Sequence, residues 1–238
     1  MRFLLSLVVL LLSTVQARAE TVDDLLSGLG QVDITLKILF LITVLALVPS
    51  ILITVTAFTR IVIVLSLLRH ALGTPQTPPN QVVIALSLFL TVFTMAPTFK
   101  KMDEVALQPY LAGKVSDVEA VKLAVKPLKE FMLRNTRKED LKLFLDVKGE
   151  KPSSPEEVSM VTLIPAFMVS EIKTAFEVVF VVFLPFIVID LLVASILMSM
   201  GMMMLSPMII SLPFKIMLFV LVDGWSLIME TLAASFFV

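Results

Sequence analysis

The sequence predicts an all-α membrane protein built from hydrophobic helical hairpins, with a mostly helical polar lobe between them. Hydrophobic residues make up 58% of the 238 residues and charged residues 16%, whereas soluble domains have about 45–50% and about 25%. The mean hydropathy is +1.01. The apolar residues form about four long segments, and a helix of about 20 apolar residues crosses a bilayer. Residues 98–158, in contrast, hold twelve of the nineteen basic and eleven of the twenty acidic residues.

Residues 1–19 have the pattern of a cleavable signal peptide. Arg2 supplies the positive start, Phe3–Leu12 the apolar centre, and Ala17–Ala19 the small-x-small cleavage pattern. The apolar centre is shorter than the about 20 residues that span a bilayer. An uncleaved anchor helix is the alternative interpretation.

Residues 20–97 predict the first hydrophobic hairpin. Ile34–Phe58 is long enough to cross a membrane, and Pro49 in its middle predicts a kink. Val82–Met95 is a second, shorter candidate crossing, which we expect to end at Pro97. The segment that precedes Ile34 is acidic and polar.

The two candidate crossings of this hairpin are joined by a tight loop, Gly73–Asn80, which contains three prolines and one glycine. Arg60 and Arg69 precede the loop, and the positive-inside rule places it on the cytoplasmic side. We expect both arginines to lie at the membrane interface. This topology agrees with a chain that starts outside the cytoplasm.

Residues 98–158 predict a helical, extracytoplasmic lobe. Ser116-x-x-Glu119 resembles a capping box, Pro127 suits the start of a second helix, and Thr136-x-x-Glu139 predicts the start of a third. Gly149 to Pro155 then breaks the helical pattern. Long loops cross the membrane regardless of their lysines, so the basic residues of the lobe do not contradict this side.

Residues 159–238 predict the second hydrophobic hairpin. Met160–Phe180 mixes charges with hydrophobic residues, and Val178–Leu197 is a candidate crossing with Pro185 inside it. Met208–Val238 would return, interrupted by Pro213 and Gly224. We expect the connection between the two segments to face the cytoplasm.

That connection contains a cluster of methionines. Five of the fourteen methionines fall within seven positions, and Gly201 and Pro207 predict a turn there. Methionine is flexible and polarizable, so such a cluster forms an apolar surface that repacks around different shapes. One interpretation is ordinary core or lipid-facing packing; the other is a deformable seal on a path through the membrane. The candidate residues are Met198, Met200, Gly201, Met202, Met203 and Met204.

Several ionisable residues lie within the apolar segments of the second hairpin, where a charge costs roughly 2.5–3.5 kcal/mol at the bilayer centre. They are Glu171, Glu177, Asp190, Lys215 and Asp223. We predict that Glu171 pairs with Lys215, within one chain or between neighbouring copies. Structural ion pairs and a role along a transport pathway both stay open for these residues.

The sequence predicts a protein without catalytic function, metal or cofactor. It has no cysteine and one histidine, His70, and it lacks the HExxH, GxSxG and phosphate-loop motifs. Asp190 and Asp223 lack the glycine-rich surroundings of an intramembrane aspartic protease. Nineteen basic against twenty acidic residues indicate no nucleic-acid surface.

Several motifs together resemble the FliP family over nearly the whole chain that follows the signal segment. In the second hairpin they are Pro165–Phe176, Pro185–Asp190, Met198–Pro207, Ile210–Ile216 and Val222–Trp225. Upstream they are Thr59–Gly73, Pro78–Asn80 and Pro127–Met132.

This resemblance implies a core subunit of the export gate of flagellar type III secretion, in the bacterial inner membrane at the flagellar basal body, with the lobe periplasmic. It implies a pentameric homo-oligomer that forms a closed pore with FliQ and FliR, with FlhB and FlhA as further partners, through which unfolded flagellar proteins pass. It also implies a seal formed by Met200, Met202, Met203 and Met204, and assembly contacts at Glu171 and Lys215. The alternatives are an injectisome homologue, a small-solute transporter and a structural membrane scaffold.

Overall fold

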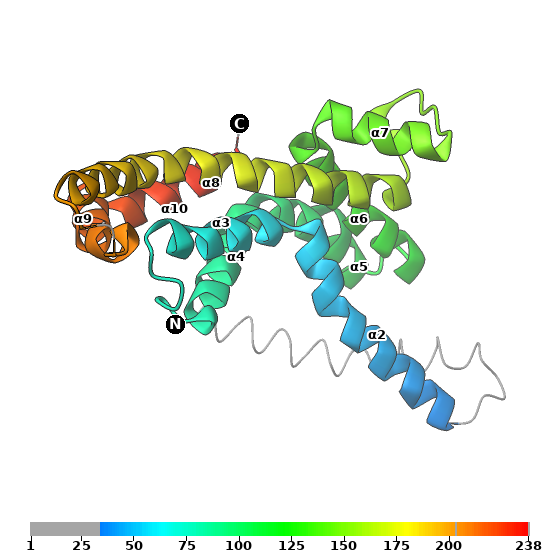
Figure 1. Ribbon diagram of the computed structural model, residues 1–238. Coiled ribbons are helices and arrows are strands. Elements are labelled where there is room, and N and C mark those ends of the chain that lie inside the picture. Colours follow the sequence, from blue (N-terminus) through cyan, green and yellow to red (C-terminus); the bar gives the residue numbers. More distant parts are fainter. Residues whose placement is uncertain (1–33, 203, 238) are drawn as a thin grey trace. The chain divides into compact units, whose positions relative to one another are not determined.

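A computed structural model describes residues 34–202 and 204–237, and within these the chain forms helices and turns without a β-strand. The signal-peptide prediction lies outside the described residues, as does Met203. Among the described residues, the chain divides into two units between Ile51 and Leu52. The α-helices are α2 (Ile34–Val55), α3 (Phe58–Ala71), α4 (Asn80–Met102), α5 (Gln108–Leu111), α6 (Asp117–Asn135), α7 (Lys138–Lys148), α8 (Met160–Ser199), α9 (Pro207–Leu221) and α10 (Gly224–Ala234) (Figure 1).

Helix α2 continues past Pro49 and ends at Val55, slightly before the predicted boundary. At the break between α2 and α3, two threonine hydroxyls donate hydrogen bonds to backbone carbonyls at the end of α2. The Thr56 hydroxyl donates to the Leu52 carbonyl at 2.8 Å, and the Thr59 hydroxyl donates to the Ile53 carbonyl at 2.9 Å. These bonds satisfy carbonyls that the interrupted helix leaves without an amide partner.

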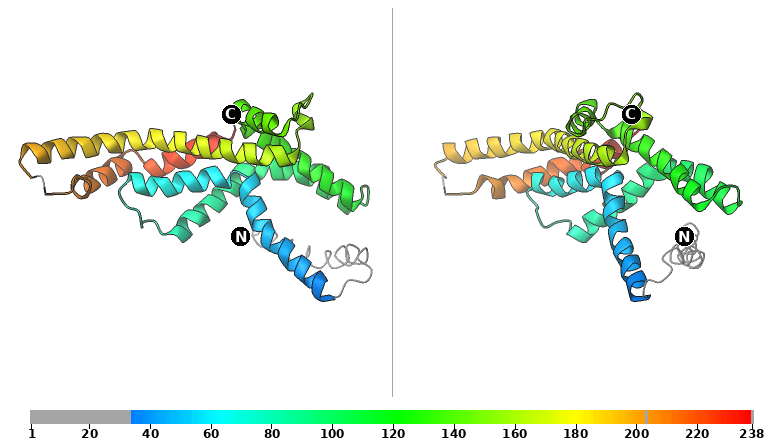
Figure 2. Two further views of the ribbon diagram at one scale, coloured as in Figure 1. Left: turned by 45° about the vertical axis from the view of Figure 1, so that its right-hand side comes forward. Right: turned by 90° about the vertical axis from the view of Figure 1, so that its right-hand side faces the viewer.

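Helix α3 is the central helix of the core in residues 52–238. Ile61, Val64, Leu65 and Leu68 recur at helical spacing and are at most 2% exposed. This face packs against α8 and α4, and Figures 1 and 2 show α3 running beside α8. The apolar stretch between the two arginines is therefore buried against protein.

The prediction that the second crossing ends at Pro97 is wrong. Helix α4 contains Pro97 and continues through a π-helical segment, Asp103–Leu107, into α5. The buried hydroxyls of Ser87, Thr91 and Thr94 each donate to the carbonyl four residues earlier. A helix held by its neighbours and by side-chain hydroxyls tolerates a proline.

The polar lobe has one continuous helix where the sequence predicts two that are separated at Pro127. Pro127 lies buried inside α6 rather than starting a new helix. Helix α7 begins at Lys138, close to the predicted start, but the Thr136 hydroxyl donates to the Met132 carbonyl at 2.7 Å and so closes α6. Gly149, with φ +71°, ends α7, at the position where the sequence predicts the break.

The second hairpin consists of one long helix and two shorter ones. Helix α8 has 40 residues and contains Pro165 and Pro185, so the mixed and apolar segments are continuous. Helices α9 and α10 return along it, with a bend of 63° between them (Figure 2). The bend requires glycine at position 224, because a Cβ there would lie 2.3 Å from the Phe219 ring.

By length and composition, two helical segments among the described residues are able to cross a membrane, Asn80–Leu111 and Met160–Ser199. The number rises to four if α2 with α3, and α9 with α10, each count as one span. The all-α membrane architecture predicted from the sequence is confirmed.

Candidate functional site

The methionine-rich turn connects α8 to α9 and is closed by backbone hydrogen bonds. The amide of Met202 donates to the Leu197 carbonyl at 3.0 Å, and the amide of Gly201 donates to the Met198 carbonyl at 3.1 Å. This is the Schellman arrangement, which needs a left-handed residue after the helix. Gly201 provides it with φ +74°, and Pro207 occupies the first turn of α9. Both residues act as the sequence predicts.

The methionines of this turn point away from the core of the protomer. Met198 is 60% exposed, Met200 65% and Met204 100%, while Met202 is half-buried. Met203 lies outside the described residues. Leu197, beside them, is 7% exposed. Within one protomer these side chains are therefore not core residues, and they are available to other molecules.

The apolar surface continues from the turn along both helices of the hairpin. No charged residue occurs between Asp190 and Lys215. Seven large apolar side chains of the two helices are 59–75% exposed: Phe180, Val181, Leu191 and Leu192 on α8, and Met208, Ile209 and Leu221 on α9. A surface of this kind marks contact with other polypeptides or with lipid.

An ion pair fastens α9 to α8 behind the turn. The Lys215 ammonium lies 2.6 Å from Asp190 and donates to the Ala71 carbonyl at 3.4 Å. The Ser211 hydroxyl donates to the other Asp190 oxygen at 2.5 Å. The Lys215 side chain is 4% exposed and that of Asp190 33%. The pair neutralises the two charges that border the apolar hairpin.

The prediction that Glu171 pairs with Lys215 is wrong within the chain, because Glu171 is bound by Arg60. The Nε and Nη2 atoms of Arg60 donate to the two carboxylate oxygens at 2.9 and 2.5 Å. A planar guanidinium matches a carboxylate with two parallel bonds, which an ammonium cannot do. Glu171 is fully buried, and its carboxylate is occupied within the protomer.

Three other segments complete the surroundings of Arg60. Its Nη1 donates to the carbonyl and hydroxyl of Ser235 at 3.1 and 2.9 Å, and its Nη2 to Asn135 at 3.4 Å. The guanidinium carbon lies 3.8 Å from the centre of the Phe236 ring. One side chain thus joins α3, α6, α8 and the segment after α10.

Arg69 is likewise buried, at 7% exposure, and holds the loop that follows α3. It donates to the Pro78 carbonyl at 2.9 Å and to Asn80 at 2.8 Å. Both arginines, which we expected at the membrane interface, therefore bind protein groups inside the core of the protomer.

Ion pairs also join α7 to α8. Arg137 binds Glu177, and Asp140, which is 1% exposed, binds Lys173. The hydrogen bond that Arg137 donates to the Glu177 carboxylate raises the pKa of Arg137 above its ordinary value. Sequence reasoning missed Arg137 and Asp140, because their partners lie 40 and 33 positions away.

Asp223 makes no ion pair among the described residues. It is exposed, adopts a left-handed conformation with φ +48°, and accepts the Leu227 amide on its carbonyl at 3.1 Å. Asp223 lies at the bend between α9 and α10, directly before α10. Its backbone carbonyl accepts the first hydrogen bond of that helix, and its side chain makes no capping bond.

The start of α8 should be sensitive to acid. Lys148 lies 2.6 Å from Glu150, and the Thr162 hydroxyl donates to Glu150 at 2.8 Å. The hydrogen bond from Lys148, followed by that from Thr162, lowers the pKa of Glu150. A lowered folded-state pKa contributes stability above the unfolded value of about 4.3. That contribution is lost as the pH falls through the folded value.

We therefore expect amide hydrogen exchange in residues 150–162, corrected for its intrinsic pH dependence, to accelerate below about pH 4. Glu150→Gln should exchange faster near neutral pH and lose this acid dependence. An identical acid profile in the variant would show that Glu150 is not the responsible group.

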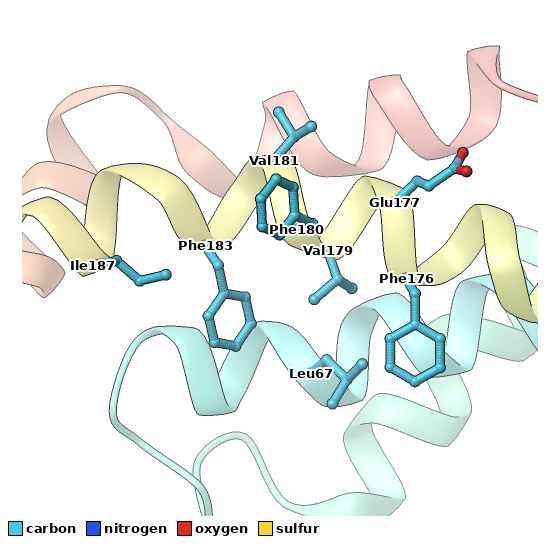
Figure 3. Close-up of a pocket in the computed structure, with 8 residues that line it drawn as sticks. All are labelled: Leu67, Phe176, Glu177, Val179, Phe180, Val181, Phe183 and Ile187. Atoms are coloured by element: carbon cyan, nitrogen blue, oxygen red, sulfur yellow. The ribbon is translucent and has the colours of Figure 1, made fainter.

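A shallow apolar groove lies between α3 and α8. Figure 3 shows Phe176, Val179 and Phe183 of α8 pointing toward Leu67 of α3. Phe180, Val181, Ile187 and Glu177 complete the lining. Among the described residues, no group of three or more His, Asp or Glu side chains is placed to hold a metal. The features found in the described residues are therefore surfaces for packing and for contact with other molecules.

The chain matches the model of the FliP family over residues 41–232. It is 55% identical over 216 residues to the flagellar biosynthetic protein FliP of Aquifex aeolicus (strain VF5), covering 90% of both chains. It is also 55% identical over 203 residues to the protein of that name from Bacillus subtilis (strain 168), covering 85% of this chain and 92% of the relative. The range matched by the family model contains α3, the lobe and the methionine-rich turn. The chain belongs to the FliP family.

Proposed function

We propose that this chain is a pore-forming core subunit of the flagellar type III secretion export gate, which passes unfolded flagellar proteins across the bacterial inner membrane. The single observation that carries the proposal is the turn between α8 and α9. It presents Met198, Met200 and Met204 outward at 60–100% exposure. The names of the relatives, which are flagellar, favour this system over an injectisome.

A channel for polypeptides must exclude ions and still admit side chains of many sizes. Thioether side chains suit this task because they are flexible and apolar, and an apolar constriction closes by dewetting. No charged residue lies between Asp190 and Lys215, and these two neutralise one another at 2.6 Å. In this proposal the turn forms a seal without a charge that would hold water in the pore.

One such turn does not enclose a pore, so the proposed seal requires several copies. The exposed apolar faces of α8 and α9 provide the contact surfaces between neighbours. We propose a pentameric arrangement assembled with FliQ and FliR, with FlhB and FlhA as partners outside the pore and lipid around it. The polar lobe, α6 and α7, would lie on the periplasmic side.

Glu171 and Lys215 have a different place in this proposal from the assembly contacts that the family resemblance implies. Glu171 is fully buried and Lys215 nearly so, and both have partners in the same protomer. In the proposed assembly they act by holding the protomer in shape, and the exposed apolar faces make the contacts between copies.

The test replaces Met200, Met202, Met203 and Met204 with alanine in the full chain and measures efflux of small ions from vesicles that contain the extracted export-gate complex. Shortened side chains should leave a gap, so we expect faster efflux than from the unmodified complex. The control is the pair Met102→Ala and Met160→Ala, which are half-buried and remote from the turn.

Tight vesicles with the four alanines would contradict the seal. If that complex also unfolded at a lower temperature, the turn would be a scaffold element. Equal leakage from the control pair would likewise contradict a role specific to the turn.

A further inference from the structure

The described methionines of this protein differ widely in accessibility. Met95 and Met132 are fully buried in the core, whereas Met198, Met200 and Met204 at the turn are 60–100% exposed, and Met208 and Met217 on α9 are 62% and 56% exposed. A thioether reacts with peroxides at a rate that follows its exposure. The structure therefore separates protected sulfur atoms from reactive ones in the same chain.

We propose that the methionine-rich turn is a redox modification site, at which oxidants of the peroxide class convert the exposed thioethers to sulfoxides. The thioether sulfur attacks one peroxide oxygen and the O–O bond breaks. That oxygen bonds to sulfur, and the other leaves as water after proton transfer. The sulfur is oxidised by two electrons and hydrogen peroxide is reduced by two.

The local structure favours this reaction at the turn. Gly201 turns the chain after α8, so Met200 and Met204 lie beyond the last residue of that helix, and Met204 is 100% exposed. Sulfur atoms of the core are enclosed: Met132 lies in the cluster of Phe131 and Phe167. Hydrogen peroxide is comparable in size to water, so it reaches the turn wherever water does.

The consequence, which rests on the proposed function, is a seal that oxidation opens. A sulfoxide is polar and accepts hydrogen bonds, whereas a thioether is apolar. Sulfoxides in an apolar constriction would hold water there and prevent closure by dewetting. Sulfoxide reductases, one for each epimer, reverse the modification, so the effect is reversible.

The first measurement is chemical. The full chain in its extracted complex is treated with increasing hydrogen peroxide, and sulfoxide is quantified at each methionine by peptide mass. We expect the sulfoxide fraction at Met198, Met200 and Met204 to exceed that at Met95 and Met132 by about tenfold or more at low dose. Equal oxidation of both classes in the folded protein would overturn the proposal.

The second measurement is efflux from vesicles before oxidation, after oxidation, and after treatment with both sulfoxide reductases. We expect oxidation to increase efflux and reduction to restore it. Leucine replaces the methionines at 198, 200, 202, 203 and 204 in the test variant. Leucine has a similar volume and is not oxidised, so this complex should stay closed in peroxide.

A variant with Met102→Leu and Met160→Leu, two half-buried residues remote from the turn, is the control and should open on oxidation like the unmodified complex. Equal opening of the five-leucine variant would overturn the proposal, because the reactive site would then lie elsewhere. Selective oxidation without any change in efflux would reject the seal and leave the modification site standing. The peptide masses thus separate failure of this inference from failure of the proposed function.

Discussion

Glu171→Ala should lower the free energy of unfolding by about 3–5 kcal/mol, because it leaves the Arg60 guanidinium buried without its carboxylate. Both side chains are at most 4% exposed, and two hydrogen bonds of 2.9 and 2.5 Å join them. Arginine does not deprotonate in proteins, so it cannot escape this cost by losing its charge. The measurement is thermal unfolding in detergent, followed by the fluorescence of Trp225, the single tryptophan.

Glu177→Ala is the matched control, since it removes the same group from the same helix. The Glu177 side chain is 64% exposed, and exposed ion pairs contribute at most about 1 kcal/mol. The double variant Arg60→Met, Glu171→Leu should recover most of the loss, because apolar residues can replace a buried pair. Equal effects of Glu171→Ala and Glu177→Ala would contradict the role of burial.

Asp190→Ala should cost about 3 kcal/mol, near the lower end for a broken buried pair. It leaves the Lys215 ammonium, at 4% exposure, with only the Ala71 carbonyl at 3.4 Å. Lysine can lose its proton, which limits the cost. We expect α9 to separate from α8, with faster amide exchange in residues 207–221 as the measurement.

Substituting Lys215 should lower the stability by less than substituting its partner Asp190. Lys215→Met leaves Asp190, which is 33% exposed and still accepts the Ser211 hydroxyl at 2.5 Å. The smaller desolvation of Asp190 predicts a smaller loss than for Asp190→Ala. Ser211→Ala alone removes one hydrogen bond and should cost about 1 kcal/mol. A larger loss of stability from Lys215→Met than from Asp190→Ala would contradict this order. It would show that leaving the Asp190 carboxylate unpaired costs more than leaving the Lys215 ammonium unpaired.

The sequence predicts the features of this protein that depend on local chemistry. A glycine and a proline around the methionines indicate a turn, and the structure confirms it with Gly201 at φ +74° and Pro207 in the first turn of α9. Hydrophobic composition indicates the membrane class in the same way. These features need no knowledge of which helices touch.

Features that depend on tertiary contacts were not predictable in this way. Glu171 and Lys215 have opposite charges on separate segments, and nothing local shows that Arg60 and Asp190 are their partners, 111 and 25 positions away. Pro97 and Pro127 break isolated helices, but both lie inside helices here. Packing against neighbouring helices outweighs the local preference.

The uninterrupted length of α8 has a further consequence for how the protein meets its surroundings. Forty residues at a rise of 1.5 Å extend for roughly 60 Å, about twice the thickness of the hydrocarbon layer. A straight rod of this length cannot fit inside that layer without an extreme tilt. A crossing of that layer by α8 would therefore leave about half of its length against water, headgroups or other polypeptides, and would place its charged first half and its methionine-rich end at different depths.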